Sequence, residues 1–361
     1  MKLTIFIGGL SGGGAERVCC NLANYLTRNG HDVEFLTMSD DESSYQLDER
    51  IPWYSLISRS ERKTFISDNI LRLSRLKKYL RTTNSDIILA MLPITMLLLL
   101  HYKNLTSAKI AIAERNAPWR MNRLVQNRIC ALADRADAWF FQTNCVKDWY
   151  APYIHRAHIS VIPNAINEGF VVRGYVGKRK NVIVSAGRLN KQKNQELLIR
   201  AFAVVCEQIP DFRLEIYGVG PLLQKLQLIA EQVGVTDKVR FCGYEPNLTN
   251  KIHDAYMFVL SSDYEGIPNA LMEAMAVGLP CISTDCDGGG ASLLIKDEVN
   301  GLLVPPQDIN SLANAMIRLI NDVEFASSLG RKASQISKDL SCNKIYSQWE
   351  MELSNIAKNS N

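Results

Sequence analysis

The sequence predicts an α/β protein made of two parallel-sheet domains. Its 361 residues, 47% of them hydrophobic, are enough to form two cores. Short apolar runs typical of buried strands alternate with helical patterns along most of the chain. A stretch with three glycines and four Lys/Arg divides this alternation into two series. We therefore expect a first domain at 1–166, a linker at 167–181 and a second domain at 182–340.

The composition argues against several classes of protein. The formal net charge is only +4, so binding to nucleic acid is not expected. The nine cysteines show no disulfide or zinc spacing, which favours reduced thiols in the cytoplasm. The most apolar run, 87–100, contains Pro93 and is shorter than the roughly 20 residues of a spanning helix. The N-terminus lacks the features of a signal peptide, and no segment is expected to cross a bilayer.

The first predicted strand runs from Lys2 to Leu10, and a glycine-rich turn leads from it into a helix at 15–28. Such a turn lets backbone N–H groups approach an anion. The dinucleotide fingerprint fails here, because its third glycine position is occupied by Arg17, and NAD is not expected.

A basic amphipathic helix is predicted from Ser58 to Thr82. Its expected apolar side is formed by Phe65, Ile66, Ile70, Leu73 and Leu76, and cations fill the rest, among them Arg72, Arg75, Lys77, Lys78 and Arg81. One interpretation is a helix packed on its own sheet with a solvated basic face. The other is that the basic face binds anionic lipid or a lipid-linked diphosphate.

The strand that begins near Ala108 ends at Glu114 and Arg115, before a turn at Pro118. Polar groups at the carboxyl end of such a strand are candidates for ligand contact. Runs at 138–144 and 158–166 are expected to be the last strands of the first domain.

The second domain repeats the alternation. Strands are predicted at 182–186, 212–217, 239–242 and 257–260, and helices at 194–208 and 221–233. Arg188 and Lys193 follow the first of these strands. Because the carboxyl end of a parallel strand is where ligands bind, these two cations could neutralise a diphosphate.

Two carboxylates follow the strand at 257–260. Glu265 lies in the loop, and Glu273 lies in a helix that is apolar on nearly every side and starts after Pro268. A buried carboxylate needs hydrogen-bond donors, and a helix start favours anions, so a ligand with hydroxyls and phosphate would suit both features. The alternative is that both glutamates are solvated.

Asp285 and Asp287 form a D-x-D pair that could suggest a metal. Hard cations usually need more oxygen ligands than two, so we expect no metal site. Glycines 288–290 would instead let the loop run close to a ligand.

Five motifs together resemble family 4 of the retaining glycosyltransferases. They are GGAER (13–17), IPNAI (162–166), GRLNKQKN (187–194), YGVGP (217–221) and EGIPNALMEAMAVGLP (265–280). That family has the GT-B fold, so the resemblance implies two Rossmann-like domains that face each other across a cleft. The resemblance implies that Glu265 holds sugar hydroxyls, that Glu273 binds the ribose diol and that Asn269 helps with sugar or phosphate. It also implies that residues 341–361 form a helix crossing back to the first domain. Many relatives carry a histidine where this chain has Arg115, which leaves any general base unidentified.

The resemblance also assigns the remaining site residues. The diphosphate would lie near Arg188, Lys193, the amides of Ala270 and Leu271, and the glycines Gly13 and Gly14. The nucleobase would lie near Tyr244 and Asn247. The acceptor would meet Glu114, Arg115, Arg72, Arg75 and Lys78.

We therefore expect a retaining transferase that moves a hexose or N-acetylhexosamine from a nucleotide-diphosphate sugar, UDP-linked by likeness, to a lipid-linked (polyprenyl diphosphate) saccharide. It would need no cofactor and no metal, and would work on the anionic inner face of the cell membrane. Two alternatives remain open: a nucleotide-sugar epimerase on the same fold, and a nucleotide-sugar-binding partner protein without turnover.

Overall fold

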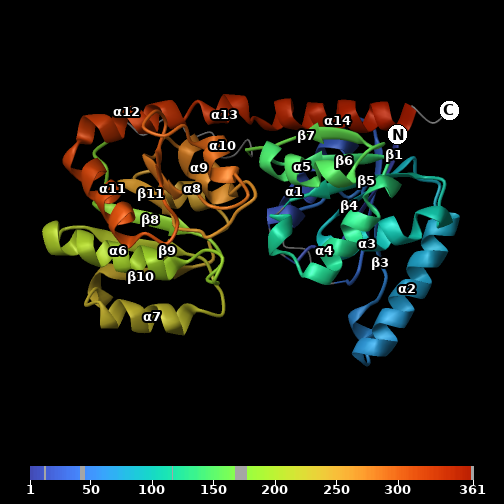
Figure 1. Ribbon diagram of the computed structural model, residues 1–361, viewed down its shortest axis with the longest axis horizontal. Coiled ribbons are helices and arrows are strands. Elements are labelled where there is room, and N and C mark those ends of the chain that lie inside the picture. Colours follow the sequence, from blue (N-terminus) through green and yellow to red (C-terminus); the bar gives the residue numbers. More distant parts are fainter. Residues whose placement is uncertain (12–13, 41–44, 116, 167–176, 359–361) are drawn as a thin grey trace. The chain divides into compact units, whose positions relative to one another are not determined.

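A computed structural model describes residues 1–11, 14–40, 45–115, 117–166 and 177–358. The chain forms two compact units (Figure 1). The first contains Met1–Ala165 and Asn343–Asn361, and the second contains Ile166–Cys342. Most of the expected linker, at 167–176, lies outside the described residues.

The first unit is built on a seven-stranded parallel sheet with the strand order β3-β2-β1-β4-β5-β6-β7. Its strands are β1 (Lys2–Ile7), β2 (Asp32–Thr37), β3 (Trp53–Ser55), β4 (Ile87–Met91), β5 (Lys109–Glu114), β6 (Ala138–Phe141) and β7 (His158–Val161). Its helices are α1 (Gly14–Arg28), α2 (Phe65–Thr82), α3 (Pro93–Tyr102), α4 (Arg123–Ala131), α5 (Asn144–Tyr150) and α14 (Cys342–Lys358).

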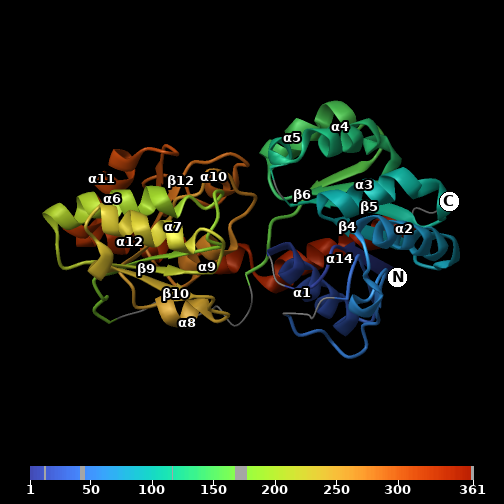
Figure 2. The ribbon, with the colours of Figure 1, turned by 90° about the horizontal axis from the view of Figure 1, so that it is seen from below.

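Helices cover both faces of this sheet. α1 and α14 lie on one face, whereas α3, α4 and α5 lie on the other (Figure 2). Two aromatic contacts hold α14 in place: Trp349 packs on Phe140 of β6 with ring centroids 4.6 Å apart, and Tyr346 packs on Tyr25 of α1 at 5.5 Å. The last helix of the chain is therefore part of the first unit's core.

Helix α2 differs from its prediction at the N-terminal end. It starts at Phe65 rather than near Ser58, because Thr64 adopts an extended conformation and accepts a hydrogen bond from the amide of Ser67. Leu76 is buried as expected, but Phe65, Ile66 and Ile70 are 83%, 71% and 63% exposed. The prediction of one packed apolar side is wrong for this first part of the helix, which extends away from the rest of the first unit (Figure 1).

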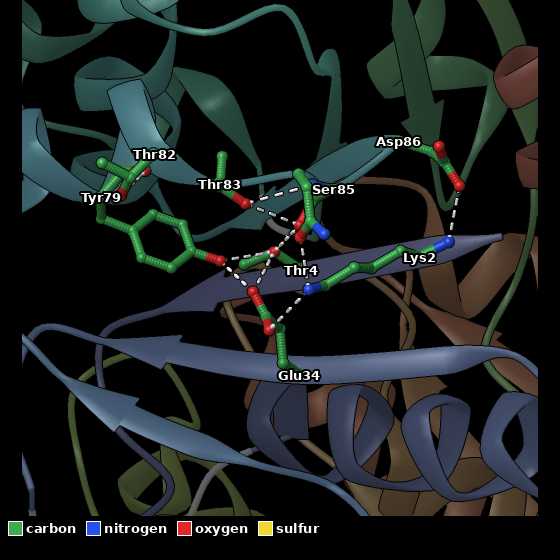
Figure 3. A network of polar contacts seen from close by, with 9 residues as sticks. Lys2, Thr4, Glu34, Tyr79, Thr82, Thr83, Ser85 and Asp86 are labelled. Atoms are coloured by element: carbon green, nitrogen blue, oxygen red, sulfur yellow. Dashed lines mark hydrogen bonds and ion pairs between the residues drawn. The ribbon is translucent and has the colours of Figure 1, made fainter.

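The C-terminal part of α2 is anchored by a polar network near the amino ends of β1 and β2 (Figure 3). The Tyr79 hydroxyl donates to the buried carboxylate of Glu34 on β2, and Thr4 of β1 donates to the same oxygen at 3.0 Å. Ser85 lies 2.6 Å from the Thr4 hydroxyl, and Lys2 Nζ lies 3.7 Å from the Glu34 carboxylate. Burial, followed by the contact with Glu34, raises the pKa of Tyr79 to about 12. This network ties α2 to the middle of the sheet.

The second unit has a six-stranded parallel sheet with the order β10-β9-β8-β11-β12-β13. Its strands are β8 (Val182–Ala186), β9 (Arg213–Tyr217), β10 (Val239–Gly243), β11 (Met257–Leu260), β12 (Cys281–Thr284) and β13 (Leu302–Val304). Its helices are α6 (Gln195–Gln208), α7 (Leu223–Gln232), α8 (Leu248–Ile252), α9 (Asn269–Ala276), α10 (Gly290–Leu294), α11 (Ile309–Asn321), α12 (Val323–Ala333) and α13 (Ile336–Asp339). One core lies under α6, α7, α11 and α12, and a second core lies under α8, α9 and α10.

The predicted fold class is confirmed: both units are parallel sheets covered by helices on both faces. Strands β3 and β13, of three residues each, were not predicted. Within the described part of the chain, every helix is too short or too polar to span a bilayer.

Candidate functional site

Each sheet has one point where the direction of strand succession reverses. In the second unit this point lies between β8 and β11, and in the first unit it lies between β1 and β4. In open α/β sheets, ligands bind outside the carboxyl ends of the strands at such a switch point. The loops after β8 and β11 are therefore where a site is expected in the second unit.

Lys193 and Glu265 come from these two loops and meet in the structure. Lys193 Nζ donates to Glu265 Oε1 at 2.5 Å, and the two side chains are 17% and 8% exposed. The Ser262 hydroxyl donates to the same oxygen at 2.7 Å, and Gln192 Nε2 lies 3.5 Å from Glu265 Oε2. The structure thus brings together a cation and a carboxylate that lie far apart in the sequence.

Close glycine packing makes room for Lys193. A Cβ added at Gly187 would lie 2.9 Å from Lys193 Cε, and the φ of +157° at this position is one that other residues rarely adopt, so glycine lets the lysine chain lie across this backbone without strain. A Cβ at Gly218, in the loop after β9, would lie 2.0 Å from the carbonyl oxygen of Gly187. The GRLNKQKN and YGVGP motifs are therefore packed directly against each other.

The Glu265 loop also rests on the loop after β12. The Glu265 amide donates to the Asp287 carbonyl at 2.8 Å, and a Cβ added at Gly290 would lie 1.6 Å from the Gly266 carbonyl oxygen. Gly290 thus permits backbone-to-backbone contact between these loops. This contact fixes the backbone that carries Glu265.

Helix α9 begins just beyond Glu265. Its N-cap is Pro268, which makes no side-chain cap, and the helix contains the predicted residues Asn269, Ala270 and Leu271 in its first turn. Glu273 is buried at 5% exposure, as are the apolar side chains around it. The N-terminus of α9 is suited to an anion, and Glu273 offers a carboxylate in the second turn of the same helix.

The other predicted residues of the second unit are more exposed. Arg188 is exposed at the end of β8, and its carbonyl accepts from Gln195 Nε2 at 3.1 Å. Tyr244, after β10, is 65% exposed, and Asn247 is exposed at the start of α8. All three lie in loops after parallel strands, at the carboxyl edge of the sheet.

In the first unit, Glu114 ends β5 and is buried at 2% exposure. The Tyr150 hydroxyl donates to its Oε2 at 3.1 Å, and the Arg115 amide donates to its Oε1 at 3.0 Å. Burial, together with the Glu114 charge, raises the pKa of Tyr150. The carboxylate is therefore held in place by two donors.

Arg115 has a different environment from the one its prediction assumed. Its guanidinium lies over the Trp349 ring at 4.9 Å from the centroid, and Nη1 donates to the Ile162 carbonyl at 3.2 Å. Within the described residues, its Nε and Nη2 are buried without a hydrogen-bond partner. Burial lowers the pKa of Arg115 to about 10. The side chain points into the layer between the sheet and α14, and its role at an acceptor stays a prediction.

The remaining predicted residues of the first unit lie around α1 and α2. Gly14 begins α1, and Gly13 lies outside the described residues. Arg72 donates to the Met38 carbonyl at 3.1 Å, Arg75 makes two hydrogen bonds to the Glu61 carboxylate at 2.8 and 2.5 Å, and Lys78 is exposed. Two of the three α2 cations predicted to meet the acceptor are therefore engaged in contacts within the unit.

Asp285 and Asp287 are both exposed. Within the described residues, no group of three or more His, Cys, Asp or Glu side chains could hold a metal ion.

Sequence reasoning missed Ser262, Gln192 and Tyr150 as partners of the two predicted glutamates. Ser262 lies two residues after the end of β11 and three residues before Glu265, so its place near a strand end could have identified it. No local pattern indicated Gln192 or Tyr150, because their contacts depend on how separate loops meet.

Comparisons with known proteins identify the family and the fold of this chain. Residues 12–170 match the family described as Glycosyltransferase Family 4, and residues 174–336 match the family described as Glycosyl transferases group 1. An exopolysaccharide phosphotransferase of Streptomyces coelicolor is 29% identical over 97% of this chain, and the match spans 40% of that protein's length.

Two further proteins match over their full length. An α-1,4-N-acetyl-D-galactosaminyltransferase of Campylobacter jejuni, named for a saccharide on diNAcBac-PP-undecaprenol, is 27% identical over 97% of each chain. The structure of HepE from Anabaena, solved in complex with UDP, superposes with a TM-score of 0.84 at 17% identity, covering 98% of this chain and 100% of that one. The chain therefore belongs to the glycosyltransferases that join a family 4 domain to a group 1 domain in the GT-B fold.

Proposed function

We propose that this glycosyltransferase moves a hexose or N-acetylhexosamine from a UDP-linked sugar to a lipid-linked saccharide, with retention of the anomeric configuration. The observation that carries the proposal is the Lys193–Glu265 pair at the switch point of the second unit. A cation and a carboxylate at this position suit the two parts of such a donor. The cation suits the diphosphate, and the carboxylate suits the sugar hydroxyls.

In the proposed reaction, the bond between the sugar C1 and the diphosphate oxygen breaks and negative charge develops on the leaving diphosphate. Lys193, Arg188 and the first amides of α9 stabilise that charge, and no metal is required. The acceptor hydroxyl attacks C1 from the same face, and its proton passes to the leaving diphosphate oxygen. Glu265 orients the sugar through its hydroxyls, and Glu273 accepts hydrogen bonds from the ribose diol.

The donor and acceptor classes are suggested by similar proteins. The Campylobacter relative is named for an undecaprenol-linked saccharide, and the Anabaena structure contains UDP. We extend both properties to this chain and place the reaction on the cytoplasmic face of the membrane. Glu114, held by Tyr150 at the carboxyl edge of the first unit's sheet, is the proposed acceptor contact there.

The test is transfer by purified Lys193→Ala and Glu265→Ala variants, with Lys191→Ala as the matched control. Lys191 is an exposed cation two residues from Lys193. Losing one group that stabilises transition-state charge typically costs about 10²- to 10³-fold in kcat, so both site variants should fall by that much. Lys191→Ala should transfer like the wild type.

Breaking a buried ion pair by removing one partner can cost about 3–5 kcal/mol of folding stability, so thermal unfolding is measured alongside. Glu265→Gln keeps hydrogen-bonding capacity and serves as a second variant if Glu265→Ala unfolds. Wild-type turnover in a folded site variant would remove the mechanism. A new epimer formed from UDP-N-acetylglucosamine alone would favour an epimerase, and donor binding without any turnover would favour a non-catalytic partner protein.

A further inference from the structure

The N-terminal tip of α2, defined here as residues 59–70, has a surface that neither the fold nor the transfer reaction explains. Phe65, Ile66 and Ile70 are the three most exposed large apolar side chains of α2, at 83%, 71% and 63%. All three lie in the first two turns of α2, so they form one group at the N-terminal end of this helix. Leaving three large apolar groups in water is unfavourable unless a partner covers them.

Cations surround these apolar side chains. Arg59, Arg62 and Lys63 are exposed directly before the helix. Among the described acids nearby, Glu61 is bound by Arg75, and Asp68 accepts a hydrogen bond from the Lys63 amide. Asp40 Oδ1 lies 3.9 Å from Arg62 Nη2 in a partly exposed ion pair, which is weak and leaves the region positive. Residues 59–81 contain eight Lys/Arg against two Asp/Glu, so the whole helix region is strongly positive.

The fold holds this tip in position. Thr64 caps the first turn of α2, and the Tyr79 hydroxyl anchors the last turns to Glu34 in the sheet (Figure 3). Leu76 and Leu80 are buried against the same unit. The helix is therefore fixed at one end and presents its apolar residues at the other.

The topology places the tip of α2 at the carboxyl edge of the first unit's sheet. α2 follows β3 and precedes β4 in a parallel sheet, so it starts from the carboxyl edge and runs toward the amino edge. Glu114 lies at the carboxyl end of β5, on that same edge. A surface bound by the tip would thus lie on the side of the unit that carries the proposed acceptor contact.

We propose that the tip of α2 docks the protein on an anionic lipid bilayer by inserting Phe65, Ile66 and Ile70 among the lipids, while Arg59, Arg62 and Lys63 contact the headgroups. The purpose of this docking rests on the proposed function, because a lipid-linked acceptor lies in a membrane. Apolar side chains flanked by cations are the chemistry of interfacial helices, whose apolar face enters roughly 5–10 Å into the headgroup and acyl boundary. Arg72 and Arg75, predicted with Lys78 to meet the acceptor or lipid, also donate to groups of their own unit, and that role stays a prediction.

A second copy of the chain is a less suitable occupant. A symmetric contact through this tip would bring the same cations together on both sides, and like charges across an interface are unfavourable. An anionic bilayer complements them.

The test is flotation of the whole protein with vesicles of phosphatidylcholine, with or without phosphatidylglycerol, in the absence of donor and acceptor. The test variant combines Phe65→Gln, Ile66→Gln and Ile70→Gln. The control combines Leu228→Gln, Val323→Gln and Met351→Gln, whose parent side chains are 57%, 60% and 55% exposed elsewhere on the molecule. Glutamine is a good helix former, so α2 should remain helical.

The wild type and the control should float with the anionic vesicles, and added salt should weaken that binding. The tip variant should partition at least about tenfold less, since each inserted side chain contributes apolar burial. Brominated lipid should quench the tryptophan fluorescence of a Phe65→Trp variant more than that of the wild type. The fluorescence of a Val323→Trp variant should be quenched no more than that of the wild type.

Three results would overturn the docking proposal: tip-variant flotation equal to that of the wild type, no wild-type flotation with either vesicle, or a wild-type dimer that the tip variant dissociates. Transfer to a water-soluble acceptor without vesicles separates this proposal from the proposed function. If the wild type, the tip variant and the control variant transfer sugar equally but do not float as expected, only the docking proposal is removed. Correct flotation with no transfer removes only the proposed function.

Discussion

Lys193 and Glu265 lie 72 positions apart in the sequence, and their side chains meet at 2.5 Å. Burying such a pair contributes little net stability compared with apolar packing, because both charges lose their hydration. Stability therefore gives a weak reason for its presence, whereas the proposed recognition of a diphosphate and of sugar hydroxyls gives a functional one. Gly218 and Gly290 are needed as well as the charged residues, because a side chain at either position would collide with the backbone of the neighbouring loop.

Gly290→Ala should damage the site without touching any charged group. The added Cβ would lie 1.6 Å from the Gly266 carbonyl oxygen, so the backbone next to Glu265 must shift. We expect a loss of about 1–3 kcal/mol in the free energy of unfolding, as for other overpacked sites, and at least about tenfold slower transfer. Urea unfolding and initial rates measure the two effects.

Gly8→Ala is the control for stability, since its added Cβ would find its nearest neighbour, Leu92 Cδ1, at 3.8 Å. If Gly290→Ala matches Gly8→Ala in unfolding free energy, the close contact between the two loops is not as tight as described.

At this scale, the sequence predicted which charged residues follow the central strands but not how they pair. Strand ends are visible as apolar runs followed by glycine and polar residues, and this placed Lys193 and Glu265 at the same edge. Partners such as Ser262 and Tyr150 depend on the geometry between loops. The burial of Arg115 against Trp349 depends on a helix more than 200 residues later, which no local pattern reports.

Among the elements, α2 shows how amphipathic patterning can mislead. Its apolar residues share a stripe, yet only the C-terminal part lies on the sheet, because the helix is longer than the surface beneath it. Polar residues that the pattern does not distinguish, Thr4, Glu34 and Tyr79, form the attachment. Short strands such as β3 and β13 escaped prediction because three residues carry too little periodicity.

Tyr79→Phe should weaken the attachment of α2 and alter the pH dependence of stability. Removing the hydroxyl leaves the buried Glu34 carboxylate with one donor fewer, which should cost about 1–3 kcal/mol of unfolding free energy near pH 7. The folded pKa of Tyr79, about 12, lies above the ordinary value of about 10 for the unfolded chain. The unfolded state therefore loses this proton first, and the stability that the wild type gains from Tyr79 is present below pH 10 and lost between about pH 10 and 12.

Urea unfolding of the wild type and of Tyr79→Phe from pH 7 to 12 measures this effect. The difference in unfolding free energy should be constant up to about pH 10 and then shrink. Tyr54→Phe is the control, because the Tyr54 side chain is 51% exposed. A difference that does not change above pH 10 would contradict the assigned environment of Tyr79.

In the molecule as a whole, the chain builds most of the first unit, then the whole second unit, and then returns to complete the first. Residues 343–358 follow the second unit in sequence but pack in the first, where Trp349 is fully buried. The two-domain division was visible in the sequence as a repeated alternation of strands and helices. The docking of α14 was expected only from family resemblance, because its own sequence shows an amphipathic helix without saying which sheet it covers.

Trp349→Ala should destabilise the first unit selectively. Removing a fully buried tryptophan that packs on Phe140 and Arg115 typically costs about 3–5 kcal/mol. Thermal unfolding with and without UDP separates the units, because a ligand raises only the stability of the part it binds. In Trp349→Ala, the unfolding transition that UDP does not shift should occur at a lower temperature than in the wild type. The midpoint of the transition that UDP stabilises should be unchanged.

Met351→Ala, at an exposed position of the same helix, is the control. Equal unfolding of Trp349→Ala and Met351→Ala would mean that α14 is not part of the first unit's core.

The proposed mechanism depends most on the binding of a nucleotide diphosphate by Lys193 at the switch point of the second unit. Calorimetric titration of UDP and of uridine into the wild type and into folded Lys193→Ala tests it directly. A hydrogen bond to a charged group contributes about 1.5–3 kcal/mol, so the Kd for UDP should rise by at least about tenfold in the variant, while the Kd for uridine should stay the same. Equal UDP affinity in the two proteins would contradict the account.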